Sequence, residues 1–222
     1  SIAYSNTNVK LVGTHTGLAV GEDGPSAQMI VDIAYTRAIP NMIVVQPADW
    51  EETRQATRAL AEYEGPAYFR LGRPKVKAIF DSSYKFEIGK GRVVKKGSDL
   101  VIFATGIMVQ ESLKAMEMLE KENKLSAIGE SKNISTLKPI DRELIIELST
   151  SHGAIITAED HNYIGGLGDA VGEVLLDTQI SKPFKRIAVR DHFAETGKGP
   201  ELFEKYGLSA NHIAQPVKDS LR

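Results

Sequence analysis

Three titratable side chains suited to a substrate site follow the first predicted strand. His15 lies in GTHTG, and Glu22 and Asp23 are adjacent in VGEDGPSAQ (20–28). Flanking glycines let a ligand approach the backbone, and a carboxylate fixed in a glycine-bounded turn can hold a substrate hydroxyl. The structural alternative is a histidine bonded to nearby backbone and acids that cap the next helix. That alternative explains one acid more easily than two.

Two arginines end a later predicted strand. Arg70 and Arg73 stand in YFRLGRP, and the guanidinium fork binds phosphate or carboxylate through paired hydrogen bonds. Surface solvation would explain a single arginine, whereas two at a strand end, near a histidine loop, favour an anion site. The residue types therefore indicate a phosphate fork, a fixed carboxylate and a strand-end imidazole.

Two glycine patterns are weak as nucleotide motifs. YIGGLGDAVGEVL (163–175) follows a predicted strand and opens a helix, but its glycines do not fit G-x-G-x-x-G. Close packing of the helix on the sheet is the better explanation for them. The GKG at 197–199 lacks the Ser/Thr and the upstream glycine of a P-loop.

His161 follows two acids, Glu159 and Asp160. It could be a ligand or a base, although such a residue is more often a hydrogen-bonding group at a strand end. No group of histidines and acids has convincing metal-ligand spacing, so the sequence predicts no metal site in this chain.

Alternating strand and helix patterns would position these residues. Strands are predicted at 9–15, 41–47, 67–73, 99–106, 125–136, 154–160 and 184–191. Helices are predicted at 25–39, 48–63, 107–123, 141–149 and 166–178, followed by one or two short helices. Pro25 suits the first position of its helix. The pattern predicts an α/β fold of two domains with mostly parallel sheets, whose sites lie beyond the carboxyl ends of the strands.

The alternation breaks in one region. Residues 74–98 have no helical period and are rich in lysine, glycine and serine, which is typical of a linker and a hairpin. The predicted organisation is a first domain at 1–75, a linker with an entry hairpin at 76–95, and a second domain at 96–222.

Composition excludes several classes of protein. The 222 residues are 42% hydrophobic and 25% charged, as in ordinary globular proteins, and the net charge of -2 gives no indication of nucleic acid or an anionic membrane as partner. The chain has no cysteine, which excludes disulfides, thiolate zinc sites and cysteine nucleophiles and is consistent with a cytoplasmic location. The sequence shows no apolar run of bilayer length, and we expect neither a membrane span nor a signal peptide in it.

Several longer stretches resemble transketolases. GEDGPSAQ followed by RAIPNMIVVQPAD, and then GPAYFRLGRP, resembles the second half of the transketolase pyrimidine-binding domain. SDLVIFATG, STLKPID, AEDHNYIGGLGDAVGEVL and HFAETGKGPELFEKYGLSANHI resemble the transketolase C-terminal domain in order and spacing. The resemblance covers essentially the whole chain and is strongest to the separate C-terminal subunit of split transketolases of archaea and some bacteria.

The resemblance implies a reaction and site roles. The reaction is transfer of a two-carbon ketol unit from a ketose phosphate to an aldose phosphate, with thiamine diphosphate as electron sink and Mg²⁺ as the anchor of its diphosphate. By resemblance, His15 lies in the substrate channel, Asp23 contacts a donor-sugar hydroxyl and Arg73 grips the sugar phosphate. Arg70 and Glu22 are further substrate-binding candidates. The C-terminal domain is expected to serve dimerisation.

The sequence departs from the family in two places. Where the family usually has GPTHQ, this chain has Ser26-Ala27-Gln28, and Ala27 cannot donate a hydrogen bond from its side chain. Loss of one positioned donor can cost on the order of a hundredfold in rate, which affects the expected specificity or activity. The GIAEQN-like segment with the glutamate that activates the cofactor, and the diphosphate-binding domain, are not in this sequence. The chain thus resembles a fragment.

We therefore expect the chain to need an N-terminal transketolase subunit or domain, in a homodimer or heterotetramer, and to be inactive and without productive cofactor binding alone. Related alternatives are a deoxyxylulose-phosphate synthase-like subunit or a 2-oxoacid dehydrogenase beta-type subunit, which activity with pyruvate would reveal. A non-catalytic assembly module is the alternative outside enzymes, favoured by Ala27 and by the absent glutamate segment.

Overall fold

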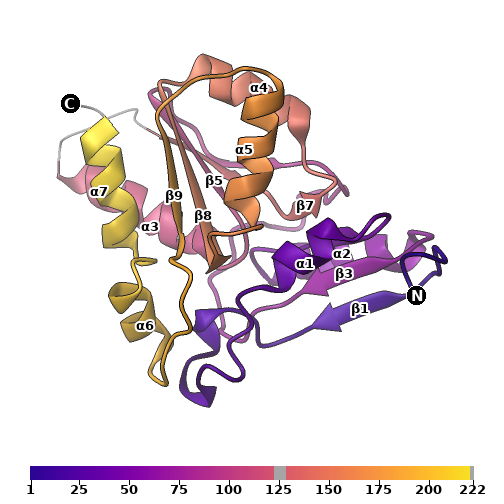
Figure 1. The fold of residues 1–222 in the computed structure, drawn as a ribbon. Helices are drawn as coiled ribbons and strands as arrows, with labels where there is room; N and C mark the ends of the chain where they lie inside the picture. Colours follow the sequence, from indigo (N-terminus) through magenta and orange to yellow (C-terminus); the bar gives the residue numbers. More distant parts are fainter. Residues whose placement is uncertain (123–128, 221–222) are drawn as a thin grey trace.

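The structure is a computed structural model that describes residues 1–122 and 129–220. Figure 1 shows two sheets, each covered by helices, with the N-terminus beside the first sheet. The first sheet has the strand order β1 (Lys10–Gly13), β3 (Ala67–Arg70), β2 (Ile43–Val45) and β7 (Thr136–Lys138). The second has the order β4 (Arg92–Lys95), β6 (Gly129–Asn133), β5 (Leu100–Ala104), β8 (Ala154–Asn162) and β9 (Phe184–Val189).

Most neighbouring strands are parallel. In the first sheet β1 and β2 both pair with β3 in parallel, and β7 pairs antiparallel with β2. In the second sheet β6, β5, β8 and β9 are parallel, and β4 is antiparallel to β6. The prediction of an α/β fold with mostly parallel sheets is confirmed.

Helices cover both faces of the second sheet. The described helices are η1 (Leu18–Asp23), α1 (Asp32–Ala38), α2 (Trp50–Glu62), α3 (Met108–Lys121), α4 (Arg142–Ser151), α5 (Leu167–Asp177), α6 (Gly199–Lys205) and α7 (Ala210–Ser220). Along β5, Leu100 and Ile102 pack in the core with α3 and α7, whereas Val101 and Phe103 pack in the core with α4 and α5. This double burial is the physical reason for the uninterrupted apolar run of β5.

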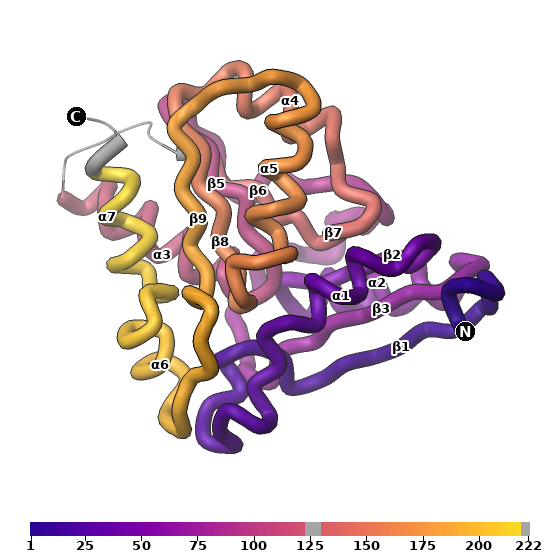
Figure 2. The backbone as a smooth tube through the Cα atoms, viewed as in Figure 1, coloured from indigo at the N-terminus to yellow at the C-terminus, as the bar shows by residue number. Residues whose placement is uncertain are grey.

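The two sheets share a core. One apolar cluster joins Val44 and Tyr68 of the first sheet to Val101 and Ile155 of the second. The chain also returns to the first sheet after β6, as Figure 2 shows, because β7 pairs with β2. The limits 1–75, 76–95 and 96–222 stay a prediction, but β7 lies inside the last of these ranges and belongs to the first sheet.

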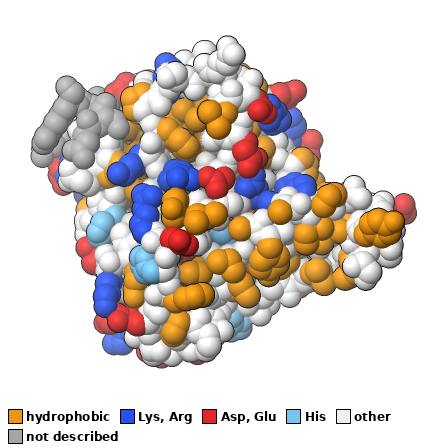
Figure 3. All heavy atoms as spheres, in the orientation of Figure 1, with side chains coloured by type: hydrophobic (Ala, Val, Ile, Leu, Met, Phe, Trp, Pro, Cys, Tyr) orange, Lys and Arg blue, Asp and Glu red, His pale blue; other side chains and the backbone are white. Residues whose placement is uncertain are grey.

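The opposite edge of the first sheet is less covered. In Figure 3, hydrophobic side chains gather over the region of β1 and α1. Among them Leu11 and Val12 of β1 are 40% and 56% exposed, and Tyr35 of α1 is 49% exposed. β1 is thus an edge strand whose faces are only partly covered.

The helix predicted at 25–39 begins later than expected. α1 starts at Asp32, and residues 25–27 form a turn, so the placement of Pro25 at a first helical position is wrong. The region 125–136 was expected to hold one strand, but it contributes β6 and the start of β7, and residues 123–128 lie outside the described part. The hairpin expected near 76–95 is also wrong, because β4 pairs with the distant β6.

Candidate functional site

The loop that follows β1, residues 14–24, carries three of the predicted site residues. His15 has a left-handed backbone with φ 60, and Gly17 and Gly24 bracket η1 with φ 78 and 79. Gly21, inside η1, has φ 74. Residues with a Cβ rarely adopt these angles, so the glycine spacing in the sequence fixes the shape of this loop.

The two adjacent acids of this loop do not cap α1. Glu22 and Asp23 are the last two residues of η1, and both are exposed. The structural alternative from the sequence, in which they cap the following helix, is therefore wrong. Their side chains are available at the surface.

Asp23 and Arg73 form an ion pair. Nη1 of Arg73 lies 3.0 Å from Oδ1 of Asp23 and donates to the carbonyl oxygen of Val20 at 2.9 Å. The side chains are 48% and 43% exposed, so solvent screens the pair and it adds little stability. Both bonds use Nη1, so within the described residues Nε and Nη2 of the guanidinium have no partner.

A surface hollow of about 340 Å³ adjoins Arg73, between η1 and the start of α6. Its charged lining consists of Glu22, Arg73 and Lys198. Two cations and one carboxylate suit an anion that also carries hydroxyl groups. The sequence reasoning missed Lys198, which it considered only within a failed P-loop motif.

His15 is exposed on the same loop. Its Nδ1 lies 3.1 Å from Oγ1 of Thr14, and no contact joins it to Asp23 or Arg73 in the described part of the chain. The structure therefore brings Asp23 and Arg73 together, places Glu22 on the adjoining hollow, and leaves His15 solvent-facing.

Arg70 lies elsewhere and is 1% exposed. Its Nε is 2.7 Å from Oδ2 of Asp32, and its Nη2 donates to the carbonyl oxygens of Met29 and Asp160 at 2.9 and 3.1 Å. Burial opposes ionisation of Asp32, but Arg70 and the Tyr68 hydroxyl outweigh it and lower the pKa of Asp32. This placement argues against the predicted phosphate-binding role of Arg70, because its guanidinium is buried and bonded to protein groups.

The end of β8 is a buried polar segment. Oδ1 of Asp160 accepts from the Leu18 N–H at 2.8 Å, and Oδ2 accepts from the Ala19 N–H at 3.1 Å. Burial raises the pKa of Asp160, while Arg70 and these N–H groups act in the opposite direction. The carboxylate of one sheet thus caps the first turn of η1, which belongs to the other.

Glu159 caps a different helix. Its two oxygens accept from the N–H groups of Leu167 and Gly168 at 2.7 and 2.8 Å, at the start of α5. A Cβ on Gly166 would overlap this carboxylate, and one on Gly168 would overlap Arg186. Close packing of helix on sheet, the preferred explanation of these glycines, is confirmed.

His161 is buried and bonded to backbone. Nδ1 lies 2.7 Å from the carbonyl oxygen of Asn162, and Nε2 lies 3.4 Å from the Ala34 N–H. Burial, with Arg70 nearby, lowers the pKa of His161 to about 4. Its contacts are those of a hydrogen-bonding group at a strand end.

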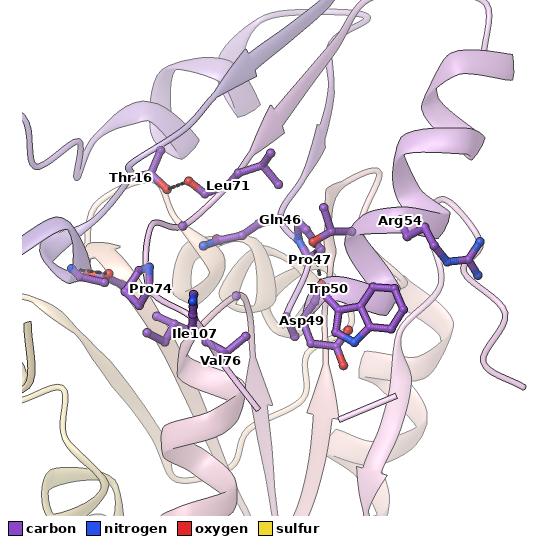
Figure 4. Close-up of a pocket in the computed structure, with 17 residues that line it drawn as sticks. Thr16, Gln46, Pro47, Asp49, Trp50, Arg54, Leu71, Pro74, Val76 and Ile107 are labelled. Carbon is purple, nitrogen blue, oxygen red and sulfur yellow. Dashed lines mark hydrogen bonds between the residues drawn. The ribbon is translucent and has the colours of Figure 1, made fainter. Parts of the chain in front are cut away.

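A larger cavity of about 580 Å³ lies between the sheets, at the carboxyl ends of β2, β3 and β5. Figure 4 shows Gln46 reaching into it and Trp50 and Arg54 on one side; Oγ1 of Thr16 donates to the Leu71 carbonyl at 3.1 Å. Oε1 of Gln46 is buried and has no hydrogen-bond partner among the residues that the structure describes. None of the five site residues predicted from the sequence lines this cavity.

The described part of the chain lacks both a metal-ligand cluster and a membrane-spanning helix. Within residues 1–122 and 129–220, no three His, Asp or Glu side chains are grouped so that they could hold a metal ion. In that same portion, no helix is both long enough and apolar enough to cross a membrane.

Two family models match the chain. Residues 1–78 match the transketolase pyrimidine-binding domain, and residues 89–213 match the transketolase C-terminal domain. A protein of Methanocaldococcus jannaschii, named as a transketolase C-terminal section, is 45% identical over 223 residues, covering 100% of this chain and 69% of that protein. A 6-deoxy-6-sulfo-D-fructose transketolase subunit of a Clostridium species is 38% identical, covering 99% of this chain and 67% of that protein.

A solved structure gives the same result. A split-gene transketolase, described as an inactive beta4 tetramer, superposes with a TM-score of 0.90 at 43% identity, covering 100% of this chain and 69% of that one. The chain thus spans about two thirds of these relatives. The glycine-shaped loop, the two mostly parallel sheets and these matches lead to one conclusion: the chain belongs to the transketolase family and matches its pyrimidine-binding and C-terminal domains.

Proposed function

We propose that this chain is the donor-sugar-binding part of a thiamine-diphosphate-dependent transketolase, which moves a two-carbon ketol unit from a ketose phosphate to an aldose phosphate. The observation that carries the proposal is the exposed Asp23–Arg73 pair on the glycine-shaped loop. Such a pair offers a carboxylate for hydroxyl groups and a guanidinium edge for phosphate within one small area.

Each side chain has a role set by its free atoms. Oδ1 of Asp23 faces Arg73, so Oδ2 is the oxygen that accepts from a donor hydroxyl. Nε and Nη2 of Arg73 form the edge for phosphate, and Lys198 adds a second positive charge across the hollow. Glu22 accepts from a further hydroxyl, and the exposed His15 lines the approach of the substrate.

The cofactor belongs to the complete enzyme. Thiamine diphosphate supplies the carbanion chemistry of ketol transfer, and Mg²⁺ anchors its diphosphate. Among the described residues no three His, Asp or Glu side chains are grouped for a metal ion, and we assign none of these residues to the cofactor. We propose that an N-terminal transketolase subunit or domain holds it in a homodimer or heterotetramer. The relatives named as a C-terminal section and a split-gene transketolase support this division.

The terminal anion of the donor is open to test. A relative named for 6-deoxy-6-sulfo-D-fructose matches 99% of this chain, and a guanidinium fork accepts sulfonate oxygens as well as phosphate oxygens. Ala27 is exposed in the turn after Asp23 and offers no side-chain donor. We take the phosphate as the primary expectation.

The test is ketol transfer by this chain together with the N-terminal polypeptide. Arg73→Ala should raise KM for a ketose phosphate by about ten- to hundredfold, because it removes charge-assisted hydrogen bonds. KM for the same ketose without its phosphate should change little. The matched control is Arg142→Ala, which breaks another half-exposed pair at the same 3.0 Å, with Asp177, and should leave both KM values within about twofold.

Other outcomes would point elsewhere. If Arg73→Ala raises KM more for a sulfonated ketose than for the ketose phosphate, the donor is a sulfonated sugar. Turnover of pyruvate without a ketose donor would favour a synthase or dehydrogenase beta-type subunit. If the complex assembles with thiamine diphosphate and Mg²⁺ but turns over none of these donors, the remaining function is a non-catalytic assembly module. Ala27, which lacks a side-chain donor, favours that alternative.

A further inference from the structure

The loop that bears Asp23 is fastened from the C-terminal domain. Asp160, at the end of β8, is 1% exposed, and its two oxygens accept from the N–H groups of Leu18 and Ala19 at 2.8 and 3.1 Å. These are the first N–H groups of η1, which have no partner inside the helix itself. One buried carboxylate therefore fixes the start of the loop helix across the interface between the sheets.

The loop is shaped to receive this carboxylate. A Cβ on Gly17 would overlap the carboxylate of Asp160, and the backbone of Gly17 has φ 78. Both facts require glycine at this position. The second glycine of GTHTG thus serves a close approach between two segments more than 140 residues apart, as Leu18 and Asp160 are separated by 142 positions.

The other end of the loop is held by the same domain. Nε2 of Gln28 donates to the carbonyl oxygens of Gly21 and Glu195 at 3.2 and 3.1 Å. A Cβ on Gly24 would overlap the side chain of Thr196. The loop is therefore held at both ends by segments of the C-terminal domain.

The held segment leads directly to the proposed donor site. The carbonyl oxygen of Val20, one residue after Ala19, accepts from Nη1 of Arg73, and Asp23 is the last residue of η1. A shift of the start of η1 would move both the carboxylate and the anchor of the guanidinium. Displacements of about 1 Å in substrate-positioning groups can cost on the order of a hundredfold in rate.

We infer that Asp160 is a positioning residue for the donor-sugar site, acting from the C-terminal domain through the start of η1. The inference rests on the proposed function. It gives the C-terminal domain a part in donor binding in addition to the assembly role expected from the sequence.

The neighbouring Glu159 provides a matched control. It is 0% exposed and also caps a helix with two hydrogen bonds, but its helix, α5, lies within the C-terminal domain. Asp160→Asn and Glu159→Gln each replace a buried capping carboxylate with an amide of the same shape. Only the first loosens the loop that carries Asp23.

The first measurement is hydrogen exchange by mass spectrometry on the full chain with its N-terminal partner. Asp160→Asn should speed amide exchange in residues 14–24 about tenfold or more, because an amide nitrogen cannot accept a hydrogen bond and the charge is lost. Glu159→Gln should speed exchange at the start of α5 and leave 14–24 unchanged. Unchanged exchange in 14–24 of the first variant overturns the inference.

The second measurement is steady-state ketol transfer. Asp160→Asn should raise KM for the ketose phosphate about tenfold. Glu159→Gln should leave this KM within about twofold, even if it lowers the unfolding midpoint as much as Asp160→Asn does. Equal KM changes in the two variants would reduce Asp160 to a structural group and overturn the inference. Absence of ketol transfer in the unsubstituted enzyme would instead count against the proposed function, while the exchange result stands by itself.

A variant on the loop side tests the same contact. Gly17→Ala should raise KM in the same way, and combined with Asp160→Asn the two effects should be clearly less than additive, because both disturb one contact. Full additivity would contradict a shared positioning contact. If Asp160→Asn folds poorly, Gly17→Ala alone tests the contact from the loop side.

Discussion

At the residue scale, two adjacent acids of one strand serve different parts of the molecule. Side chains alternate across a strand, so Asp160 reaches η1 while Glu159 reaches α5. In the sequence, this pair and His161 have the composition of a ligand or base cluster. In the structure all three are buried and bonded to backbone groups.

Burial raises the pKa of Glu159 from 4.5 to about 7, although two N–H groups act against the shift. Because the folded-state pKa lies above that of the unfolded chain, the protonated acid favours folding below about pH 4.5, and this contribution is lost as the pH rises through 7. The free energy of unfolding of the natural chain should therefore fall by about 3 kcal/mol relative to Glu159→Gln between pH 4.5 and 8.

Urea unfolding of both chains at several pH values measures this difference. The pKa of His161 is lowered from 6.5 to about 4. Its contribution to the free energy of unfolding is therefore present above about pH 6.5 and lost as the pH falls toward 4. Both chains keep His161, so subtraction removes the part of its contribution that does not depend on the Glu159 carboxylate, whose Oε2 lies 3.8 Å from Nδ1 of His161. If the free energy of unfolding changes with pH in the same way in the natural chain and in Glu159→Gln, the pKa of Glu159 is not raised.

At the element scale, the carboxylate of Asp49 joins helix α2 to the segment that connects the two sheets. Oδ1 of Asp49 accepts from the Glu52 N–H at 2.9 Å and so caps α2. Oδ2 accepts from the N–H groups of Ile79 and Phe80 at 2.7 and 2.8 Å. The segment that the sequence indicates only as an irregular linker is thereby tied to the first sheet.

Asp49→Ala should lower the free energy of unfolding by about 2–3 kcal/mol, since it removes a helix cap and two charge-assisted hydrogen bonds. Amide exchange at Ile79 and Phe80 should accelerate. The amide of Phe86, which donates to Oε1 of Gln55, should not respond and is the internal control. Asp49→Asn should cost about half as much. An equal acceleration of exchange at Ile79, Phe80 and Phe86 would contradict the anchoring role of Asp49.

At the scale of the whole molecule, contacts across the two sheets are extensive. They share an apolar core, β7 completes the first sheet, and Arg70 of β3 donates to the carbonyl oxygen of Asp160 in β8. Neither sheet can open without exposing apolar surface of the other. The two domains of the family are thus expected to unfold together.

Thermal or urea unfolding should therefore give one transition at about the same midpoint by two probes. Fluorescence of Trp50, the only tryptophan of the chain, reports on the start of α2 in the first domain, and far-UV circular dichroism reports on all helices. Coincident curves are the expected result for a cooperative unit. An earlier loss of the Trp50 signal would mean that the first domain unfolds by itself.

The sequence by itself determined the α/β class, the order of most elements, the family and the glycine-shaped loop. These features depend on local patterns: apolar period, positive-φ glycines and short motifs act within a few residues. By resemblance, the sequence also assigned Asp23 and Arg73 separate contacts with the donor sugar, and the structure joins their side chains at 3.0 Å. Their role toward a substrate stays a prediction.

Only the tertiary structure decided which charged residues face solvent. Arg70 and Arg73 are three positions apart, yet the first is enclosed by Asp32 and the Asp160 carbonyl while the second reaches the surface. It also revealed Lys198 in the hollow and Asp160 beneath the loop. Local patterns fix backbone conformation, but the partner of a side chain depends on segments that meet across more than a hundred residues. The sequence alone therefore could not separate an exposed arginine from a buried one.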